Sequence, residues 1–152
     1  MRISAKADYA VRAAAELAVS VGGSPRRAEE IANAQGIPLN FLLNILGELK
    51  LARIVQSQRG SQGGYRLARP PEEITIAEVI RAVEGPLANV HDALPEDLEY
   101  RGPAEPLRDV WVAVRASLRS VLESVTLAHL VKGSLPGPVR RLLRNADVWV
   151  AR

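Results

Sequence analysis

A glycine-rich stretch between two short β-prone segments places the strongest constraint on how this chain folds. Residues 59–64 have the sequence RGSQGG, and they separate the segments 53–57 and 65–68. Glycine clusters between such segments are typical of hairpin connections, because glycine adopts the positive φ angles of tight turns with little strain. The sequence therefore predicts a small two-stranded β-wing with a glycine-rich tip.

Three predicted helices precede this hairpin. The first covers residues 4–21, with Ser4 as its N-cap, and the second follows the N-cap Ser24 and ends at Gly36. The third covers residues 39–51 and has apolar residues at helical spacing. Its expected core positions are Leu42, Ile45, Leu46 and Leu49. Two short helices joined by a glycine-containing turn predict a helix-turn-helix, and the hairpin adds the wing.

The chain changes character after the hairpin. A short helix is predicted over residues 76–84, with Thr75 as its N-cap, and an acidic, proline-bearing loop follows over residues 87–106, the sensor-loop region. A long helix is predicted over residues 107–130, and the tail of residues 131–152 contains a further short helix.

The predicted long helix carries apolar residues separated alternately by four and three positions. These residues are Leu107, Trp111, Val114, Leu118, Val121 and Val125. Such alternation is typical of a seam along which two helices pack, and a core helix of the same domain is the alternative. The expected fold is therefore mainly α with a small β-wing: a winged helix-turn-helix DNA-binding domain over residues 1–86, plus a long dimerisation helix.

The residue inventory excludes several kinds of site. Cysteine is absent from all 152 residues, which excludes disulfides, thiolate nucleophiles, thiolate zinc sites and cysteine-ligated iron–sulfur clusters. No apolar segment approaches the roughly 20 residues that span a bilayer, and no secretory leader is recognisable. We therefore expect a cytoplasmic protein with no membrane partner.

The net charge of +3 hides an uneven distribution along the chain. Residues 1–70 carry ten basic against five acidic side chains, residues 71–109 three against ten, and residues 110–152 seven against two. A basic amino-terminal half suits a polyanionic partner, because Lys and Arg gain affinity for phosphates by releasing condensed counterions. On charge alone, an ordinary solvated surface is the simpler explanation.

The third predicted helix and the wing carry the candidate DNA contacts. Asparagine bonds adenine edges bidentately, leucine meets a thymine methyl group, and an arginine at a wing favours a narrow A·T-rich minor groove. We expect base or phosphate contacts from Ser24, Arg26, Arg27, Leu39, Asn40, Leu43, Asn44, Lys50, Ser57, Arg59, Gly60, Ser61 and Gln62. Taken singly, each of them is equally well explained as a solvated surface residue.

Two segments carry a family resemblance. They are residues 1–17, MRISAKADYAVRAAAEL, and residues 54–67, IVQSQRGSQGGYRL. With the wing motif R-G-x-x-G-G-Y at residues 59–65, the sequence resembles the IscR/NsrR/CymR-type family of winged helix-turn-helix transcriptional regulators. The resemblance covers about residues 1–87 closely and the long helix in architecture only.

The resemblance implies a homodimer in which the long helices cross and two winged helices bind a pseudo-palindromic operator in double-stranded DNA. It emphasises Leu39, Asn40, Leu43, Asn44, Ser57, Arg59 and Gly60. The expected function is a sequence-specific DNA-binding transcriptional regulator that acts as a homodimeric repressor without an iron–sulfur cluster.

The chain departs from many of these relatives in the loop. They hold an iron–sulfur cluster through three cysteines there, whereas Asp92, Leu98 and Ala104 stand in this region. Asp8 matches a position that supplies an oxygen ligand in some relatives, but without thiolates it has nothing to complete. We expect no cofactor and no metal site. A small-molecule effector between the loop, the helix over 76–84 and the dimerisation helix is a further hypothesis.

Two functions of other classes remain open. In the first, the winged helix is a protein-interaction module whose wing and Leu43 contact a partner protein; the salt dependence of DNA binding separates it from a DNA-binding regulator. In the second, a small hydrolase uses His91 with Asp92, Glu96 or Asp97. The chain has no nucleophile elbow, phosphate-binding glycine loop or H-E-x-x-H spacing, so we expect no enzyme.

Overall fold

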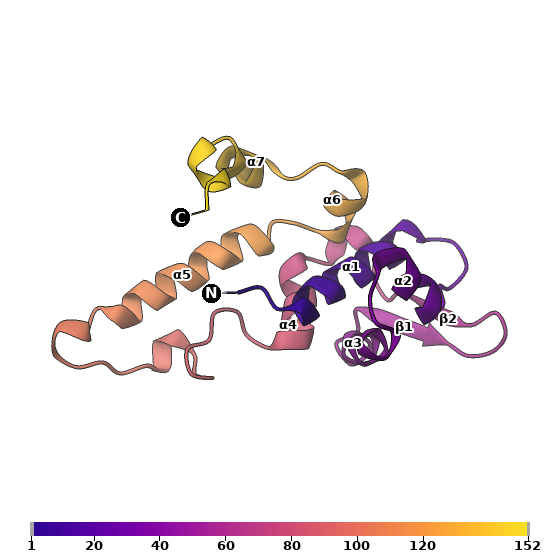
Figure 1. Cartoon of the computed structure of the whole chain (residues 1–152), viewed down its shortest axis with the longest axis horizontal. Helices are drawn as coiled ribbons and strands as arrows, with labels where there is room; N and C mark the ends of the chain where they lie inside the picture. Colours follow the sequence, from indigo (N-terminus) through magenta and orange to yellow (C-terminus); the bar gives the residue numbers. More distant parts are fainter. Residues whose placement is uncertain (1, 152) are drawn as a thin grey trace.

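The computed structural model describes residues 2–151 and is elongated, with most elements gathered at one end (Figure 1). The helices and strands are α1 (Ala5–Val19), α2 (Ala28–Gln35), α3 (Leu39–Leu51), β1 (Val55–Gln58), β2 (Gly64–Leu67), α4 (Ile76–Glu84), α5 (Leu107–Leu122), α6 (Leu127–Lys132) and α7 (Gly137–Leu143). Short 3-10 turns are η1 (Pro71–Glu73), η2 (Pro95–Asp97), η3 (Gly102–Ala104) and η4 (Ala146–Trp149). No helix in the described residues is long and apolar enough to cross a membrane.

The core forms around α1, which packs against α2, α3, α4, α6 and β2. Alanines occupy its buried face at Ala10, Ala13 and Ala14, and their small side chains let neighbouring helices approach closely. The predicted N-cap is confirmed, because the Oγ of Ser4 accepts a hydrogen bond from the Ala7 amide at 2.9 Å. The four core positions predicted for α3 are also confirmed, since all of them are buried. The mainly α fold with a small wing is therefore confirmed.

The predicted wing is present as an antiparallel pair, with Val55 opposite Leu67 at its base. A third segment joins it. The amide of Arg26 donates to the Tyr65 carbonyl at 2.8 Å, and the amide of Tyr65 donates to the Arg26 carbonyl at 2.7 Å. At Gly64 the φ angle is +149°, and a Cβ there would lie 2.5 Å from the Arg26 carbonyl oxygen. Only glycine permits this close approach, so the wing is joined to the segment before α2.

The predicted N-cap of α4 is confirmed and belongs to a capping box. The Glu78 amide donates to the Oγ1 of Thr75 at 3.2 Å, and the Glu78 carboxylate accepts from the Thr75 amide at 2.9 Å. Burial opposes ionisation of this carboxyl, but the Thr75 amide and the Arg69 guanidinium outweigh it and hold the pKa of Glu78 below its usual range. The ion pair between Glu78 and Arg69 also joins α4 to the segment that follows the wing.

The predicted start of α2 at Ser24 is wrong. The helix begins at Ala28, and Arg27 precedes it in an extended conformation. The physical reason is the strand-like pairing of Arg26 with Tyr65 in the wing, which keeps the backbone before Ala28 extended. Pairing between residues so far apart in the chain leaves no local signal.

The single helix predicted over residues 107–130 is also wrong, because α5 ends at Leu122 and α6 begins at Leu127. Thr126 forms a bridge with Thr75, and the carbonyl of Val125 accepts from the Ile76 amide at 2.9 Å. Thr126 then caps α6. Val125, a predicted dimerisation residue, is 7% exposed within the core of its own chain.

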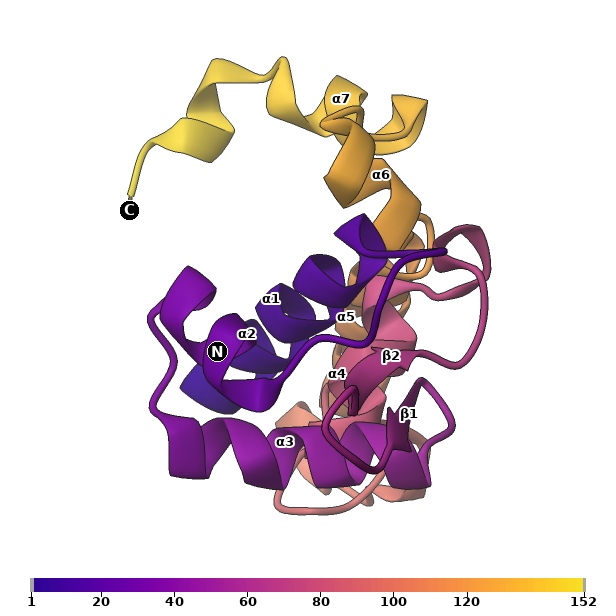
Figure 2. The same cartoon turned by 90° about the vertical axis from the view of Figure 1, so that its right-hand side faces the viewer.

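The acidic loop is held against α5, and the tail contains the predicted short helix, α7. In the loop, the Glu96 carboxylate pairs with Arg115 at 2.5 Å, and the indole N–H of Trp111 donates to the hydroxyl of Tyr100 at 3.1 Å. The tail projects from the other side of α5 and is exposed along α7 and η4 (Figures 1 and 2). The acidic loop and the basic tail therefore lie on either side of α5.

We predict that Gly64→Ala lowers the free energy of unfolding by about 2 to 4 kcal/mol, because the new methyl group collides with backbone and the φ angle is strained. The matched control is Gly47→Ala in α3, whose methyl group meets nothing within 4 Å. That change should raise stability by about 0.5 to 1 kcal/mol, the helix propensity difference. Urea unfolding followed by circular dichroism measures both; equal midpoints for Gly64→Ala and the unaltered chain would contradict the prediction.

Candidate nucleic-acid interface

The exposed face of α3 presents a mixed polar and apolar surface. Asn40 and Asn44 are exposed one helical turn apart, and Leu43 between them is 43% exposed. Leu39 and Lys50 continue the same exposed face toward its two ends. Two amide side chains and an apolar side chain at this spacing match the base-edge groups of a major groove, which admits one α-helix.

The acidic residue of α3 lies at the edge of this face and is paired with a lysine. Glu48 lies against α1, where Lys6 pairs with it at 2.9 Å. Phe41 faces the same way and packs edge-on against Tyr9, with ring centroids 5.7 Å apart. These contacts orient α3 about its axis, so the asparagines remain exposed and the single carboxylate of the helix is neutralised.

The wing tip carries the other half of the candidate interface. Arg59, Gly60, Ser61 and Gln62 are exposed, and no ion pair binds Arg59 anywhere in residues 2–151. Ser57 is exposed on β1. The wing lies beside the carboxyl-terminal end of α3 (Figure 2). A free guanidinium on a glycine-rich tip suits the electronegative floor of a minor groove.

Arg27 supports the wing from the side of α2. Its guanidinium donates to the carbonyl of Ser61 at 2.9 Å, which fixes the tip relative to the start of α2. Ser24 is exposed in the preceding loop, away from this contact. Arg27, a predicted phosphate contact, thus also positions the wing, a role that has no local signal in the sequence.

Arg26 occupies a different environment from the other predicted contacts. Its guanidinium donates to the Oγ of Ser20 at 3.2 Å and pairs with Glu16 at 3.5 Å and Glu30 at 3.3 Å. These partners come from α1 and α2, so the side chain is engaged inside the domain. In the free protein this side chain stabilises the packing of the two helices, and its role as a phosphate contact stays a prediction.

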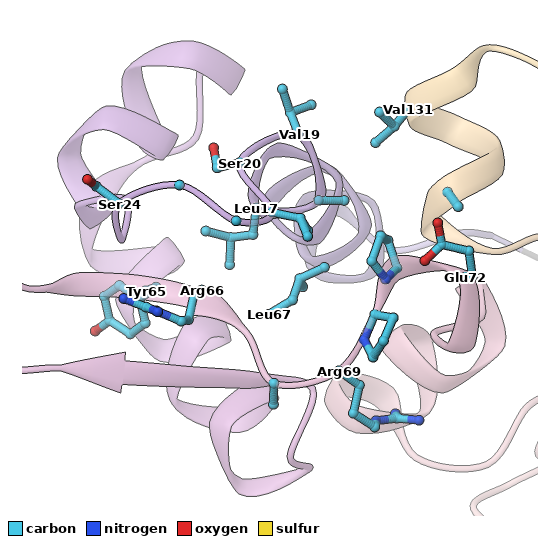
Figure 3. A pocket seen from close by; sticks show the side chains of 18 of the residues that line it. Leu17, Val19, Ser20, Ser24, Tyr65, Arg66, Leu67, Arg69, Glu72 and Val131 are labelled. Atoms are coloured by element: carbon cyan, nitrogen blue, oxygen red, sulfur yellow. The ribbon is translucent and has the colours of Figure 1, made fainter.

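A cavity of about 570 Å³ lies behind the wing, between the end of α1, β2, η1 and α6 (Figure 3). Leu17 and Leu67 lie at its centre, and Val19 and Val131 lie on its rim. Its Arg69 is bound by Glu78 at 2.8 Å. The lining contains neither histidine nor cysteine.

The apolar residues predicted for the dimerisation seam lie on α5, at the end of the molecule opposite the wing (Figure 1). Leu107, Trp111, Val114, Leu118 and Val121 are all partly exposed, and no residue of this helix is buried. An amphipathic helix normally buries its apolar face, so this one is unpartnered within the single chain.

Comparison with known proteins identifies related sequences along most of the chain. A family model described as Rrf2, iron-dependent transcriptional regulator, matches residues 3–133. A protein of Mycobacterium tuberculosis named as an HTH-type transcriptional regulator is 53% identical over 142 residues, which are 93% of this chain and 88% of that protein. The HTH-type transcriptional regulator CymR of Bacillus subtilis is 35% identical over 130 residues, covering 86% of this chain and 89% of CymR.

Solved structures match the fold as well. The structure of CymR, titled the global cysteine regulator of B. subtilis, superposes with a TM-score of 0.74 and 34% identity, covering 88% of this chain and 98% of CymR. IscR of T. potens superposes with a TM-score of 0.70 and 30% identity, covering all of this chain and 93% of IscR. Both names belong to the family whose motifs the sequence resembles.

The side chains of this chain do not fit the iron that the family description names. Cysteine is absent, and within the described residues no three His, Asp or Glu side chains lie close enough to hold a metal ion. The Nδ1 of His129 is taken up by Thr126, and Asp8 pairs with Arg12 at 3.1 Å. Iron therefore supplies no step in the function considered below.

We predict that Arg59→Ala weakens binding to duplex DNA by about 1 to 3 kcal/mol and relaxes preference at an A·T-rich position, as expected for a groove-bound arginine. Lys50→Ala should weaken all duplexes alike and lower the salt slope by about one unit. Arg108→Ala is the matched control, since Arg108 lies at the start of α5, far from the wing. Fluorescence anisotropy across a salt series measures the DNA affinity of all three variants. An unchanged affinity for Arg59→Ala would exclude the wing from the DNA interface.

Proposed function

The chain belongs to the Rrf2 family of DNA-binding transcriptional regulators, and we propose that it is a homodimeric, sequence-specific repressor that binds double-stranded DNA without a metal cofactor. In this proposal, α3 enters the major groove, and the wing enters the adjacent minor groove. Two such units bind the halves of a pseudo-palindromic operator.

One observation carries the DNA-binding geometry. The exposed face of α3, with Asn40, Leu43 and Asn44, ends beside a wing whose tip holds the free guanidinium of Arg59. The only carboxylate of α3, Glu48, lies one turn after Asn44 and is paired with Lys6. A surface that presents amide, apolar and cationic groups together, with its acidic residue neutralised by an ion pair, suits base edges and phosphates.

The exposed seam of α5 supports the homodimer. Its apolar residues repeat at four and three positions, and the single chain leaves them partly exposed. A second copy offers the same face with the same spacing, so a two-fold contact covers both seams at once. Because α5 and the wing lie at opposite ends of the protomer, such a dimer leaves both DNA-binding faces free (Figure 1).

Repression follows from occupancy of the operator. A dimer bound to two half-sites covers a segment of promoter DNA and competes there with other proteins. An effector that shifts the two winged helices relative to each other weakens both contacts together, since half-site spacing is set by the dimer. No separate chemical step is needed for this function.

The test of this function is binding of the purified protein to the DNA upstream of its own gene and to a scrambled duplex of equal length, across a salt series. We expect promoter-selective binding with a steep salt slope, because several phosphates are neutralised. Equal affinity for both duplexes at every salt concentration would contradict the proposal, and would favour a protein-interaction module that uses the wing and Leu43.

Dimerisation gives a second prediction. Replacing Leu118 and Val121 together with glutamate should dissociate the dimer, because four charges would then face each other across an apolar seam. Operator affinity should fall at least about a hundredfold, since one half-site alone binds weakly. Sedimentation velocity gives the oligomeric state and anisotropy gives the affinity. The control is Ser117→Glu on an exposed part of the same helix, and a monomeric double variant that still bound tightly would contradict the proposal.

A further inference from the structure

Three arginines line one small cavity at the junction of α4, the acidic loop and α5. The cavity measures about 410 Å³ and is lined by Arg81, Gly85, Pro86, Leu87, Glu96, Arg115 and Arg119. Arg81 comes from the last turn of α4, and Arg115 and Arg119 lie one turn apart on α5. We propose that this cavity binds a compact oxyanion that carries two negative charges, such as a phosphate, a sulfate or a small dicarboxylate.

The charges around the cavity are unbalanced in favour of an anion. Glu123 accepts hydrogen bonds from both Arg81 and Arg119 through the same oxygen, Oε1. Glu96 pairs with Arg115 alone. Two carboxylates therefore serve three guanidinium groups, which leaves one positive charge in excess. Glu84, the next carboxylate on α4, is bound by Ser4 at 2.6 Å, on the side where α1 lies.

The arginines also have hydrogen-bond donors to spare. A guanidinium has five N–H donors arranged as a planar fork that fits an oxyanion. The contacts within residues 2–151 use the Nη2 of Arg81, the Nη1 of Arg115 and the Nε of Arg119. Arg115 is the most enclosed of the three, with 17% of its side chain exposed. Enclosure strengthens its attraction for an anion, because solvent screens the charge less.

The two carboxylates are held in their charged state by the same arginines. The hydrogen bond from Arg115 lowers the pKa of Glu96, and the hydrogen bonds from Arg81 and then Arg119 lower the pKa of Glu123. An incoming anion therefore competes with a carboxylate rather than with a neutral acid. The weaker competitor is Glu96, because it has one arginine partner and lies on the short turn η2.

Binding at this cavity would change how the loop packs. Displacing Glu96 from Arg115 releases η2, which packs on α5. The cavity also spans α4, and α4 packs against α1 and α3, the helix with the candidate base contacts. An anion there would thus connect the loop, the seam helix and α3. This regulatory role rests on the proposed function, whereas the binding itself does not.

The experiment is a titration of the Trp149→Phe variant with inorganic sulfate, inorganic phosphate or succinate, at constant ionic strength maintained with sodium chloride and without DNA. Trp111 is then the only tryptophan of the chain, and its indole N–H bonds Tyr100 in the same loop. We expect saturable quenching or a shift of its emission, with a 1:1 stoichiometry by calorimetry. The three arms distinguish tetrahedral from dicarboxylate ligands.

Matched variants separate this site from a general ionic effect. Arg115→Gln and the more exposed Arg119→Gln should each weaken binding at least about tenfold, as expected for losing charge-assisted hydrogen bonds. Arg108→Gln on the same helix should leave it unchanged. Glu96→Gln should tighten binding, because it removes the competing carboxylate. Thermal unfolding checks that each variant is folded.

Two results would overturn the inference: no saturable response to any of the three anions, or equal losses for Arg115→Gln, Arg119→Gln and Arg108→Gln. Because these titrations contain no DNA, they succeed or fail independently of promoter binding. Repeating the promoter titration with the bound anion present then tests the regulatory role, and unchanged operator affinity would exclude that role alone.

Discussion

The backbone pairing between Arg26 and Tyr65 is the contact on which the winged helix end of this molecule depends. Two hydrogen bonds join the segment before α2 to strand β2, and Gly64 permits the approach because any Cβ there would collide with the Arg26 carbonyl. The pairing positions the wing beside α3. The Arg27 guanidinium, bound to the Ser61 carbonyl, then fixes the wing tip. Without this anchor, a two-stranded hairpin would be only marginally stable in water.

The second part of the chain is organised by α5, a helix that its own chain covers only in part. No residue of α5 is buried, yet the helix contacts η2 on one side and ends where Val125 and Leu127 join the core. The hydrogen bonds from Ile76 to Val125 and from Leu127 to Ile74 attach this region to the start of α4. These hydrogen bonds therefore connect the end of α5 directly to the winged helix domain.

Local patterns were sufficient to predict α1, α3, α4 and the wing. The evidence for them lies within a few residues: Ser4 and Thr75 as caps, apolar spacing along α3, and glycines between two strands. The start of α2 and the end of α5 were mispredicted because both depend on pairing with distant segments, Tyr65 in one case and Thr75 in the other. A local signal for the second did exist, since Thr126 stands three residues before His129 in a capping arrangement.

The candidate site also contains residues that local spacing predicts and residues whose contacts depend on tertiary packing. The exposed residues of α3 and the wing tip followed from spacing, since core-facing positions define which positions remain outside. The engagement of Arg26 with Glu16 and Glu30 could not be predicted, because it requires α1 and α2 to be packed first. An effector site between the loop, the helix over 76–84 and the dimerisation helix was hypothesised, but its arginine lining was not predicted, because Arg81 and Arg115 come from helices separated by the whole loop.

In the proposed complex, two copies of this chain bind one DNA site through α3 and the wing. Hydroxyl-radical footprinting on the upstream DNA tests this arrangement most directly. We predict two equivalent protected segments, centred about one helical turn or a multiple of it apart. In the Arg59→Ala variant, the minor-groove protection that flanks each segment should be lost, while the central protection remains. A single protected segment, or protection identical in the variant and the unaltered protein at saturation, would contradict this arrangement.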